Sequence, residues 1–458
     1  MEGGISVGAE ALSLSGTGAS SNGALQNVSG NNTFGGAITL AADTEIQSDA
    51  GTLTLSNTTG STITGTNTNL TFDGAGNTAV SGVISTGTGT LTKNGAGNTT
   101  LSGSSANTYS GTTTVNNGEL DLNKTSGVNA TGTGSLTIGD STGLAGTAVV
   151  KLLVNNQISD SSAVTIAADG QFNVNGKTET IGSLAGSGTV ALGAGALTTG
   201  GSNATTSYSG VISGTGSLTK AGTGTMTLSN VNTFTGATTV SAGTLALTVA
   251  NALSASSDVT VASGATLTAG AGNSQEFHSL SGAGTVTLGT GADLAIDAAS
   301  ASFTGTLNLD GATLTLNGIT LGNGMTLNVT GNSVIDFAGN STLNLASLNL
   351  AAGATLQIKN WVYGQDFFFD TGTLNGSSVN TVDPGTGPLA DINFDGFTNS
   401  TDGTGNPTGW RSWSTPGNQI APVPEPATYG ALLLGAGVTF VALRRRRRTA
   451  EAGCLGAE

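Results

Sequence analysis

Short runs in which apolar and small polar residues alternate recur along almost the whole chain. Examples are TLTL at 52–55, TTTV at 112–115, TVTL at 285–288 and TLTLN at 313–317. Alternation over four to six residues is typical of a strand with one face buried. Glycine, asparagine or serine residues separate the runs, which indicates tight turns. The pattern therefore predicts an all-β protein with very many turns.

The composition favours an ordered chain over a disordered one. Glycine supplies 74 of the 458 residues, and charged residues make up only 9 %, where about 25 % is typical of a globular domain. Disorder usually couples low hydrophobicity to high charge and proline content. This chain has only 7 prolines, and its β-formers recur at short intervals.

Two architectures fit strands this short: a string of β-sandwiches or a right-handed parallel β-helix. Residues 1–360 hold only nine aromatic residues, too few for several sandwich cores. We expect the narrow interior of a β-helix to take Val, Leu, Ile and Ala and largely to exclude aromatic side chains. We therefore predict a right-handed parallel β-solenoid over 1–360. At about 20 residues and about 4.8 Å a turn, it would be roughly 85 Å long.

Internal repeats support this solenoid. Residues 81–123 and 209–248 share SGVIS, then L-T-K-x-G-x-G, T-L-S, G-x-T-T-V and G-x-L-x-L in the same order. The similarity continues downstream, where 163–193 parallels 258–289. A unit of roughly 90–125 residues thus occurs twice, and looser versions flank it at 30–75 and 300–350.

The repeat resembles the autotransporter-associated β-strand repeat of bacterial passenger domains over 89–122 and 216–247. This resemblance implies a β-helical surface stalk in which the shared positions are structural. Glycines would form the turns, and Tyr109 and Phe234 would each fill one turn. The matching positions are Lys93, Gly95, Leu101, Tyr109, Gly111, Val115 and Gly118, then Lys220, Gly222, Leu228, Phe234, Gly236, Val240 and Gly243.

The charge of the chain argues against nucleic acid as a partner. Residues 1–426 hold 7 basic and 25 acidic residues, a balance of −18, so phosphate neutralisation is not available. Such acidity favours solubility outside the cell. With the single cysteine Cys454 no intramolecular disulfide can form. The first residues lack a basic and an apolar region, so we expect an export leader upstream of residue 1.

Aromatic residues concentrate after residue 360. Residues 361–413 hold nine of them, as many as the preceding 360. A solenoid needs its last turn covered, so we predict a small capping region over 361–420. The alternative is a platform for an extracellular polysaccharide, built from Trp410 and Trp413.

The same region contains a candidate calcium loop. Oxygen-bearing groups stand at loop positions 1, 3, 5, 7, 9 and 12, and Gly396 stands at position 6, where a sharp turn is needed. The loop resembles a single dockerin-type calcium loop, although the helix that should follow is replaced by GTGNPTGW. Calcium is thus the one candidate cofactor, and an Asx-turn-rich surface loop is the alternative. The ligands would be Asp391, Asn393, Asp395, the Phe397 carbonyl, Asn399 and Asp402.

Residues 421–450 have the layout of a membrane-retention signal. An apolar run at 427–443 follows a Pro-Glu-Pro motif, and five arginines close it. Seventeen residues span about 26 Å as a helix, the short limit for a bilayer. The arginines should stay in the cytoplasm and leave the body outside. The motif is Pro424, Glu425 and Pro426, and the membrane stop is Arg444, Arg445, Arg446, Arg447 and Arg448.

This order resembles the PEP-CTERM sorting signal that exosortases process in Gram-negative bacteria. The resemblance implies transient anchoring in the inner membrane with cleavage near 424–426. The processing partner would be an exosortase. The body would pass to the cell envelope, the outer surface or the extracellular matrix.

The sequence offers little for catalysis, and we expect no enzyme. The single histidine, His278, falls at the edge of a repeat turn, and a glycosidase would need two facing carboxylates. The acidic residues of the repeats show no such pairing: Asp169, Asp258, Glu276, Asp293, Asp297 and Asp310. Two hypotheses remain. One is a structural or adhesive surface protein, and the other is a secreted polysaccharide-binding or polysaccharide-active protein.

Overall fold

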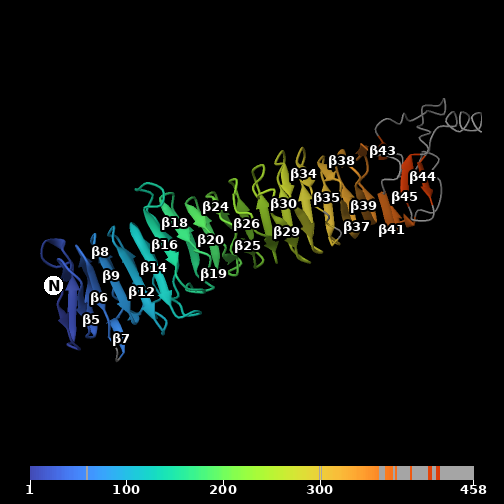
Figure 1. Ribbon diagram of the computed structural model, residues 1–458. Helices are drawn as coiled ribbons and strands as arrows, with labels where there is room; N and C mark the ends of the chain where they lie inside the picture. The colour runs from blue at the N-terminus through green and yellow to red at the C-terminus, as the bar shows by residue number, and fades with distance from the viewer. Residues whose placement is uncertain are drawn as a thin grey trace, which may run out of the picture.

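The chain folds into a long rod of stacked β-strands, seen in a computed structural model (Figure 1). The structure describes residues 1–57, 60–298, 300 and 302–360, and beyond them the backbone of five strands between 367 and 422. These residues form a parallel β-solenoid of about 16 turns. The predicted fold class, all-β and solenoidal, is confirmed. The only helix among the described residues is the short 3₁₀ segment η1, Ala19–Ser21.

Four sheets line the sides of the described rod. The first has ten strands, in the order β1 (Ser6–Val7), β4 (Asn32–Phe34), β6 (Thr52–Leu55), β9 (Asn77–Ser81), β12 (Asn98–Gly103), β14 (Gly118–Lys124), β16 (Ala148–Leu152), β18 (Gly170–Asn173), β21 (Thr189–Ala191) and β24 (Ile212–Ser213).

The largest sheet runs the whole length of the rod. Its 23 strands are β2 (Leu12–Gly16), β3 (Leu25–Asn27), β5 (Ile38–Ser48), β7 (Ser61–Gly65), β8 (Leu70–Asp73), β10 (Val83–Ser85), β11 (Leu91–Lys93), β13 (Thr113–Val115), β15 (Leu136–Ile138), β17 (Ala163–Ile166), β20 (Ser183–Gly186), β23 (Thr206–Tyr208), β26 (Thr225–Leu228), β28 (Thr244–Leu247), β30 (Thr266–Ala269), β33 (Thr285–Leu288), β35 (Thr306–Leu309), β37 (Thr320–Val329), β39 (Thr342–Leu350), β41 (Phe367–Leu374), β42 (Ser377–Ser378), β44 (Arg411–Ser414) and β45 (Gln419–Pro422).

Two six-stranded sheets complete the C-terminal half of the described rod. One contains β19 (Thr178–Ile181), β22 (Ala196–Thr199), β25 (Ser217–Lys220), β27 (Thr238–Val240), β29 (Asp258–Val261) and β32 (Ser279–Ser281). The other contains β31 (Gln275–Phe277), β34 (Asp293–Ile296), β36 (Thr313–Asn317), β38 (Ser333–Ala338), β40 (Leu356–Lys359) and β43 (Ile392–Phe394).

Strands of successive turns pair in parallel, so equivalent residues stack along the rod. Leu91 of β11 pairs with Thr113 of β13, which pairs with Leu136 of β15. These steps are 22 and 23 residues, close to the predicted 20. The step from Leu120 of β14 to Val150 of β16 is 30 residues. The additional residues of this longer turn lie mainly in the segments 125–135 and 139–147, which connect its strands.

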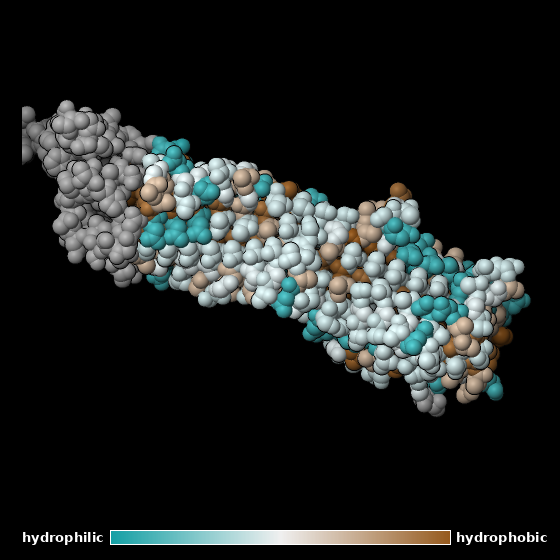
Figure 2. Space-filling view, turned by 180° about the vertical axis from the view of Figure 1, so that it is seen from behind, coloured by the Kyte–Doolittle hydropathy of each residue, from teal (hydrophilic) through white to brown (hydrophobic). Residues whose placement is uncertain are grey.

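Alternation within each strand separates core from surface, as the sequence predicts. In β26, β28 and β30 the second and fourth residues are buried and the first and third are partly exposed. The buried set forms one continuous hydrophobic core along the rod. The visible outer face is mostly of intermediate hydropathy, with scattered hydrophilic patches (Figure 2).

The expectation that the interior largely excludes aromatic side chains is wrong. All nine aromatic residues of 1–360 are buried, at no more than 6 % exposure. They are spread along the rod and stack against aliphatic residues of adjacent turns, as Phe277 does against Ile296 and Phe337 against Leu316. The aromatic residues are Phe34, Phe72, Tyr109, Phe172, Tyr208, Phe234, Phe277, Phe303 and Phe337.

Glycine is required at one corner of both repeat copies. Gly118 has φ +70°, and a Cβ there would lie 2.5 Å from the Gly95 carbonyl oxygen of the turn before. Gly243, its counterpart, has φ +62° and would place a Cβ 2.5 Å from the Gly224 carbonyl oxygen. Positive φ and a backbone contact this close both exclude a side chain. This confirms the structural role predicted for the repeat glycines.

Strand pairing changes at the C-terminal end of the described chain. Strand β41 still pairs in parallel with β39, but it pairs antiparallel with β42 and β45, and β44 pairs antiparallel with β45. Among the described residues no helix has the length and apolar character to cross a membrane. The predicted span at 427–443 lies outside them.

Candidate functional site

The aromatic residue of each repeat copy fills one turn of the solenoid, as predicted. Tyr109 and Phe234 are both fully buried. The Tyr109 hydroxyl is within 2.7 Å of the Thr113 hydroxyl. Phe234 has no hydroxyl, and the buried hydroxyl of Thr238, the counterpart of Thr113, has no hydrogen-bond partner. The two copies therefore share their packing but not their internal hydrogen bonding.

The repeat lysines lie inside the rod, where they bind backbone carbonyls. The Lys220 Nζ donates to the carbonyl oxygens of Ala221 at 2.7 Å, Gly222 at 2.9 Å and Ala242 at 3.2 Å. Lys93 makes the equivalent contacts with the carbonyls of Gly95 and Asn117. Each lysine thus joins the corner of its own turn to that of the next.

A third lysine, Lys124, is also buried and unpaired with any acid. Its Nζ donates to the carbonyl oxygens of Gly82 at 2.8 Å and Ser102 at 3.1 Å. Burial lowers the pKa of Lys93 and of Lys124 to about 8. Sequence reasoning missed the burial of these lysines, because a lysine in an alternating run is normally expected to be exposed. The recurrence of Lys93 and Lys220 at equivalent repeat positions was the available signal for those two, whereas Val249 stands at the position of Lys124 in the second copy.

Buried polar side chains complete the corners between strands. The Asn107 Oδ1 accepts the backbone N–H of Ile84, one turn earlier, at 2.9 Å, and its Nδ2 donates to the Ala130 carbonyl oxygen, one turn later. Asn232 does the same between Ile212 and Ala252. Such groups satisfy backbone donors that the strands leave unpaired. They hold the fold together and do not form a reactive site.

Glu179 is the most unusual of these corner residues. It is fully buried, and its carboxylate accepts backbone N–H groups from Gln157 at 2.8 Å, Ile158 at 3.3 Å and Thr180 at 3.2 Å. Burial nonetheless raises the pKa of Glu179 to about 7, because desolvation outweighs these three hydrogen bonds. A group that titrates near neutrality inside the rod makes its stability depend on pH.

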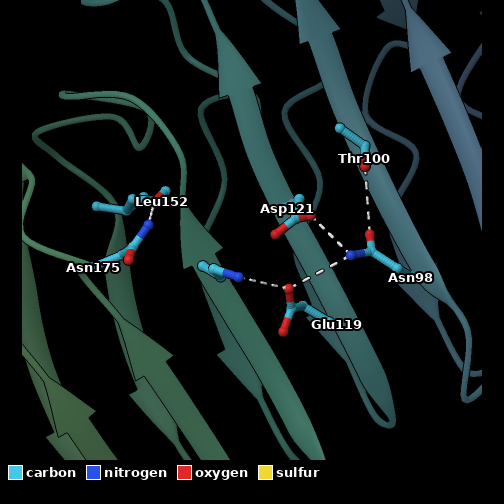
Figure 3. Close-up of polar contacts among 7 residues, drawn as sticks. Asn98, Thr100, Glu119, Asp121, Leu152 and Asn175 are labelled. Carbon is cyan, nitrogen blue, oxygen red and sulfur yellow. Dashed lines mark hydrogen bonds and ion pairs between the residues drawn. The ribbon is translucent and has the colours of Figure 1, made fainter.

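Two carboxylates lie side by side on the outer face of β14. Glu119 and Asp121 point to the same side, where Asn98 Nδ2 donates to Asp121 Oδ2 at 2.8 Å and approaches Glu119 Oε1 at 3.5 Å (Figure 3). Lys151 pairs with Glu119 at 3.3 Å. Burial, and then Glu119, raise the pKa of Asp121. Sequence reasoning overlooked this pair, although its i, i+2 spacing in a strand was the available signal.

Two further acidic residues, Asp297 and Asp169, make local structural contacts in the described rod. His278 lies at the corner between β31 and β32, as predicted, and its Nδ1 is 3.1 Å from Asp297 Oδ1. Asp169 is buried and accepts backbone N–H groups from residues 140 and 141. Within the described ranges no group of three or more acidic, histidine or cysteine side chains is placed to hold a metal ion.

Most of the predicted site residues fall outside the described part of the chain. These are the Pro424–Pro426 motif, the arginines at 444–448 and the calcium loop except for the backbone of Asn393. The backbone of Asn393 lies in β43, next to β40. The calcium site therefore stays a prediction.

Comparison with protein families identifies both motifs. A family model described as passenger-associated-transport-repeat matches residues 91–122 and 218–247. A second model, the PEP-CTERM protein-sorting motif, matches residues 422–448. The chain carries a PEP-CTERM sorting motif and autotransporter-type repeats. The sorting motif implies export to the cell envelope or surface and processing by an exosortase. No curated protein and no solved structure matches the chain.

Proposed function

We propose that this PEP-CTERM protein is a non-enzymatic rod that acts as a structural or adhesive element at the cell surface or in the extracellular matrix. The observation that carries the proposal is a solenoid of about 16 turns joined to a C-terminal sorting motif. A solenoid is elongated, so it can present a binding surface far from the point where it is attached. Its acidic charge keeps such rods apart and soluble.

The route to the surface is the finer part of the proposal. The apolar run 427–443 spans the inner membrane for a time, and the arginines at 444–448 hold its end in the cytoplasm. An exosortase then cleaves near Pro424–Pro426. We further propose that the solenoid is right-handed and that 361–420 caps its last turn, where β44 and β45 pair antiparallel.

The test of this proposal follows the full chain in cells that carry an exosortase. A chain tagged within an exposed corner should reach the outside of the cell, and mass spectrometry should find its mature C-terminus near 424–426. A substitution of Pro424, Glu425 and Pro426 by alanine should leave the chain in the inner membrane. Mature protein outside the cell that retains the arginines at 444–448 would contradict the proposed processing.

A role in polysaccharide binding or turnover is the second candidate. The aromatic residues Trp410 and Trp413 favour it, because sugar rings stack on such side chains. Calcium at the loop 391–402 would belong to the same function. Purified full-length chain should release no reducing ends from any polysaccharide if the structural role is right. Measurable turnover would overturn the non-enzymatic role.

A further inference from the structure

One corner of the rod departs from the repeat. Nine residues, 139–147, join β15 to β16. In the turn that follows β27 and β28 of the second copy, only the four residues 262–265 join β29 to β30. In repeat proteins, insertions of this kind gather on one face, which is often the binding face.

The insertion forms one wall of a cleft of about 440 Å³. The corners of the two preceding turns supply Asn94, Asn116 and Asn117, and the insertion supplies Asp140, Thr142 and Thr147. This volume falls within the range of small-molecule sites, about 300–1,000 Å³.

The inserted segment is held in place by the solenoid beneath it. Asp169 is 1 % exposed, and its carboxylate accepts the backbone N–H of Ser141 at 2.7 Å and of Asp140 at 3.3 Å. Its carbonyl oxygen accepts the N–H of Gly146 at 2.9 Å. Both ends of the insertion are thus tied to one buried residue, so a ligand would meet a preorganised wall.

The lining is suited to hydroxyl groups. Asparagine amides offer a donor and an acceptor side by side, and Asn116 Nδ2 already donates to Asn94 Oδ1 at 2.8 Å. Hydrogen bonds from the Thr142 hydroxyl and N–H lower the pKa of Asp140, so that carboxylate stays ionised as an acceptor. Among the described residues that line the cleft there is no basic side chain. The overall balance of −18 over 1–426 repels anions.

The second repeat copy shows that the fold does not need these asparagines. Ala221 and Ser241 stand where the first copy has Asn94 and Asn116, and Ala242 stands at the position of Asn117. The backbone is bonded alike: the Asn94 N–H donates to the carbonyl of the turn before at 2.9 Å, and the Ala221 N–H does so at 2.7 Å. The asparagines are therefore additions to the repeat.

We propose that this cleft binds a neutral, hydroxyl-rich saccharide and supplies an adhesive contact of the rod. The inference rests on the proposed function, because only a rod outside the cell would meet such a ligand. Asparagine amides would bind adjacent hydroxyls, and Asp140 would accept from one or two more. Charged saccharides are disfavoured by the acidic body.

The test uses the full-length chain on an array of neutral and acidic hexasaccharides, followed by calorimetry with each neutral hit. The triple variant N94A/N116S/N117A imports the residues of the second copy and should bind at least about tenfold more weakly. The matched control N308A/N328S/N349A removes three asparagines from β35, β37 and β39, many turns away from the cleft, and should bind as the parent does. Thermal unfolding of each variant checks that the fold is retained.

Three results would overturn the saccharide site. The first is that the parent binds no neutral glycan on the array. The second is that the triple variant binds as tightly as the parent. The third is that the parent binds calcium chloride alone and the triple variant does not, which would make the cleft a cation site. If the array shows no binding but the chain is found on the cell surface, the saccharide site is refuted and the proposed function is retained. If the chain binds a glycan but is never exported, the proposed function is refuted and the saccharide site is retained.

Discussion

At the scale of single residues, the two repeat copies act as internal controls for each other. The same backbone surrounds Tyr109 with its partner Thr113 and Phe234 with the unpartnered hydroxyl of Thr238. Differences between such matched sites isolate the contribution of one group. They show which buried polar atoms the fold satisfies and which it leaves without a partner.

Phe234→Tyr should stabilise the chain. The new hydroxyl would reach the position that Tyr109 occupies beside its threonine and give the Thr238 hydroxyl a partner. A hydrogen bond of this kind contributes about 1 kcal/mol, which chemical denaturation of the full chain can measure. The double variant F234Y/T238V should lose the gain. Equal stability of the parent and F234Y would show that the second copy has no room for the hydroxyl.

Glu179 should make the rod less stable as the pH rises from about 4.5 to 7. Its pKa is about 7 in the fold and near 4.5 in an unfolded chain. The folded state therefore holds more protons in this window, and its stability falls as the pH rises. Denaturation at several pH values should give a shallower slope for Glu179→Gln. An unchanged slope in that variant would assign the pH dependence to other groups.

At the scale of the strand, backbone pairing joins a typical strand of the rod to one strand of the turn before and one of the turn after. Strand β28 pairs with β26 on one side and β30 on the other. Leu245 and Leu247 point inward from it and are fully buried. Because the backbone pairing of β28 does not extend past these neighbours, damage to this strand should spread to them and fade beyond.

Leu245→Asp places an unpaired charge in the core and should unfold the turns around β28. Hydrogen exchange measured by mass spectrometry should show lost protection in β26, β28 and β30, because local unfolding exposes their amides. Strands β9 and β12 should keep the protection of the parent. Thr244→Asp, one residue earlier on the outer face, is the control and should change little. Loss of protection along the entire rod would show that the solenoid unfolds as one unit.

At the scale of the whole molecule, the sequence predicted the solenoid because alternation and repeats are local signals. Leu101 and Val115 followed directly from that pattern, and both are buried. Lys93, Lys220 and Glu179 did not, since their polar ends are satisfied in part by backbone groups of other turns. The cleft could not be predicted from the sequence for the same reason, because Asn94 and Asp140 come together only when the turns stack.

The buried corner amides also give the rod a direction of growth. Asn107 and Asn232 satisfy backbone donors of the turn that precedes them, as does Gln275 for Ala252 at 3.0 Å. A turn is therefore complete only after the following one has been added. If the chain is exported N-terminus first, each turn would complete its hydrogen bonds when the next turn emerged from the membrane. Every completed turn would then oppose backward sliding of the chain. Folding of the rod would thereby drive its own export before the sorting motif at 422–448 reaches the membrane.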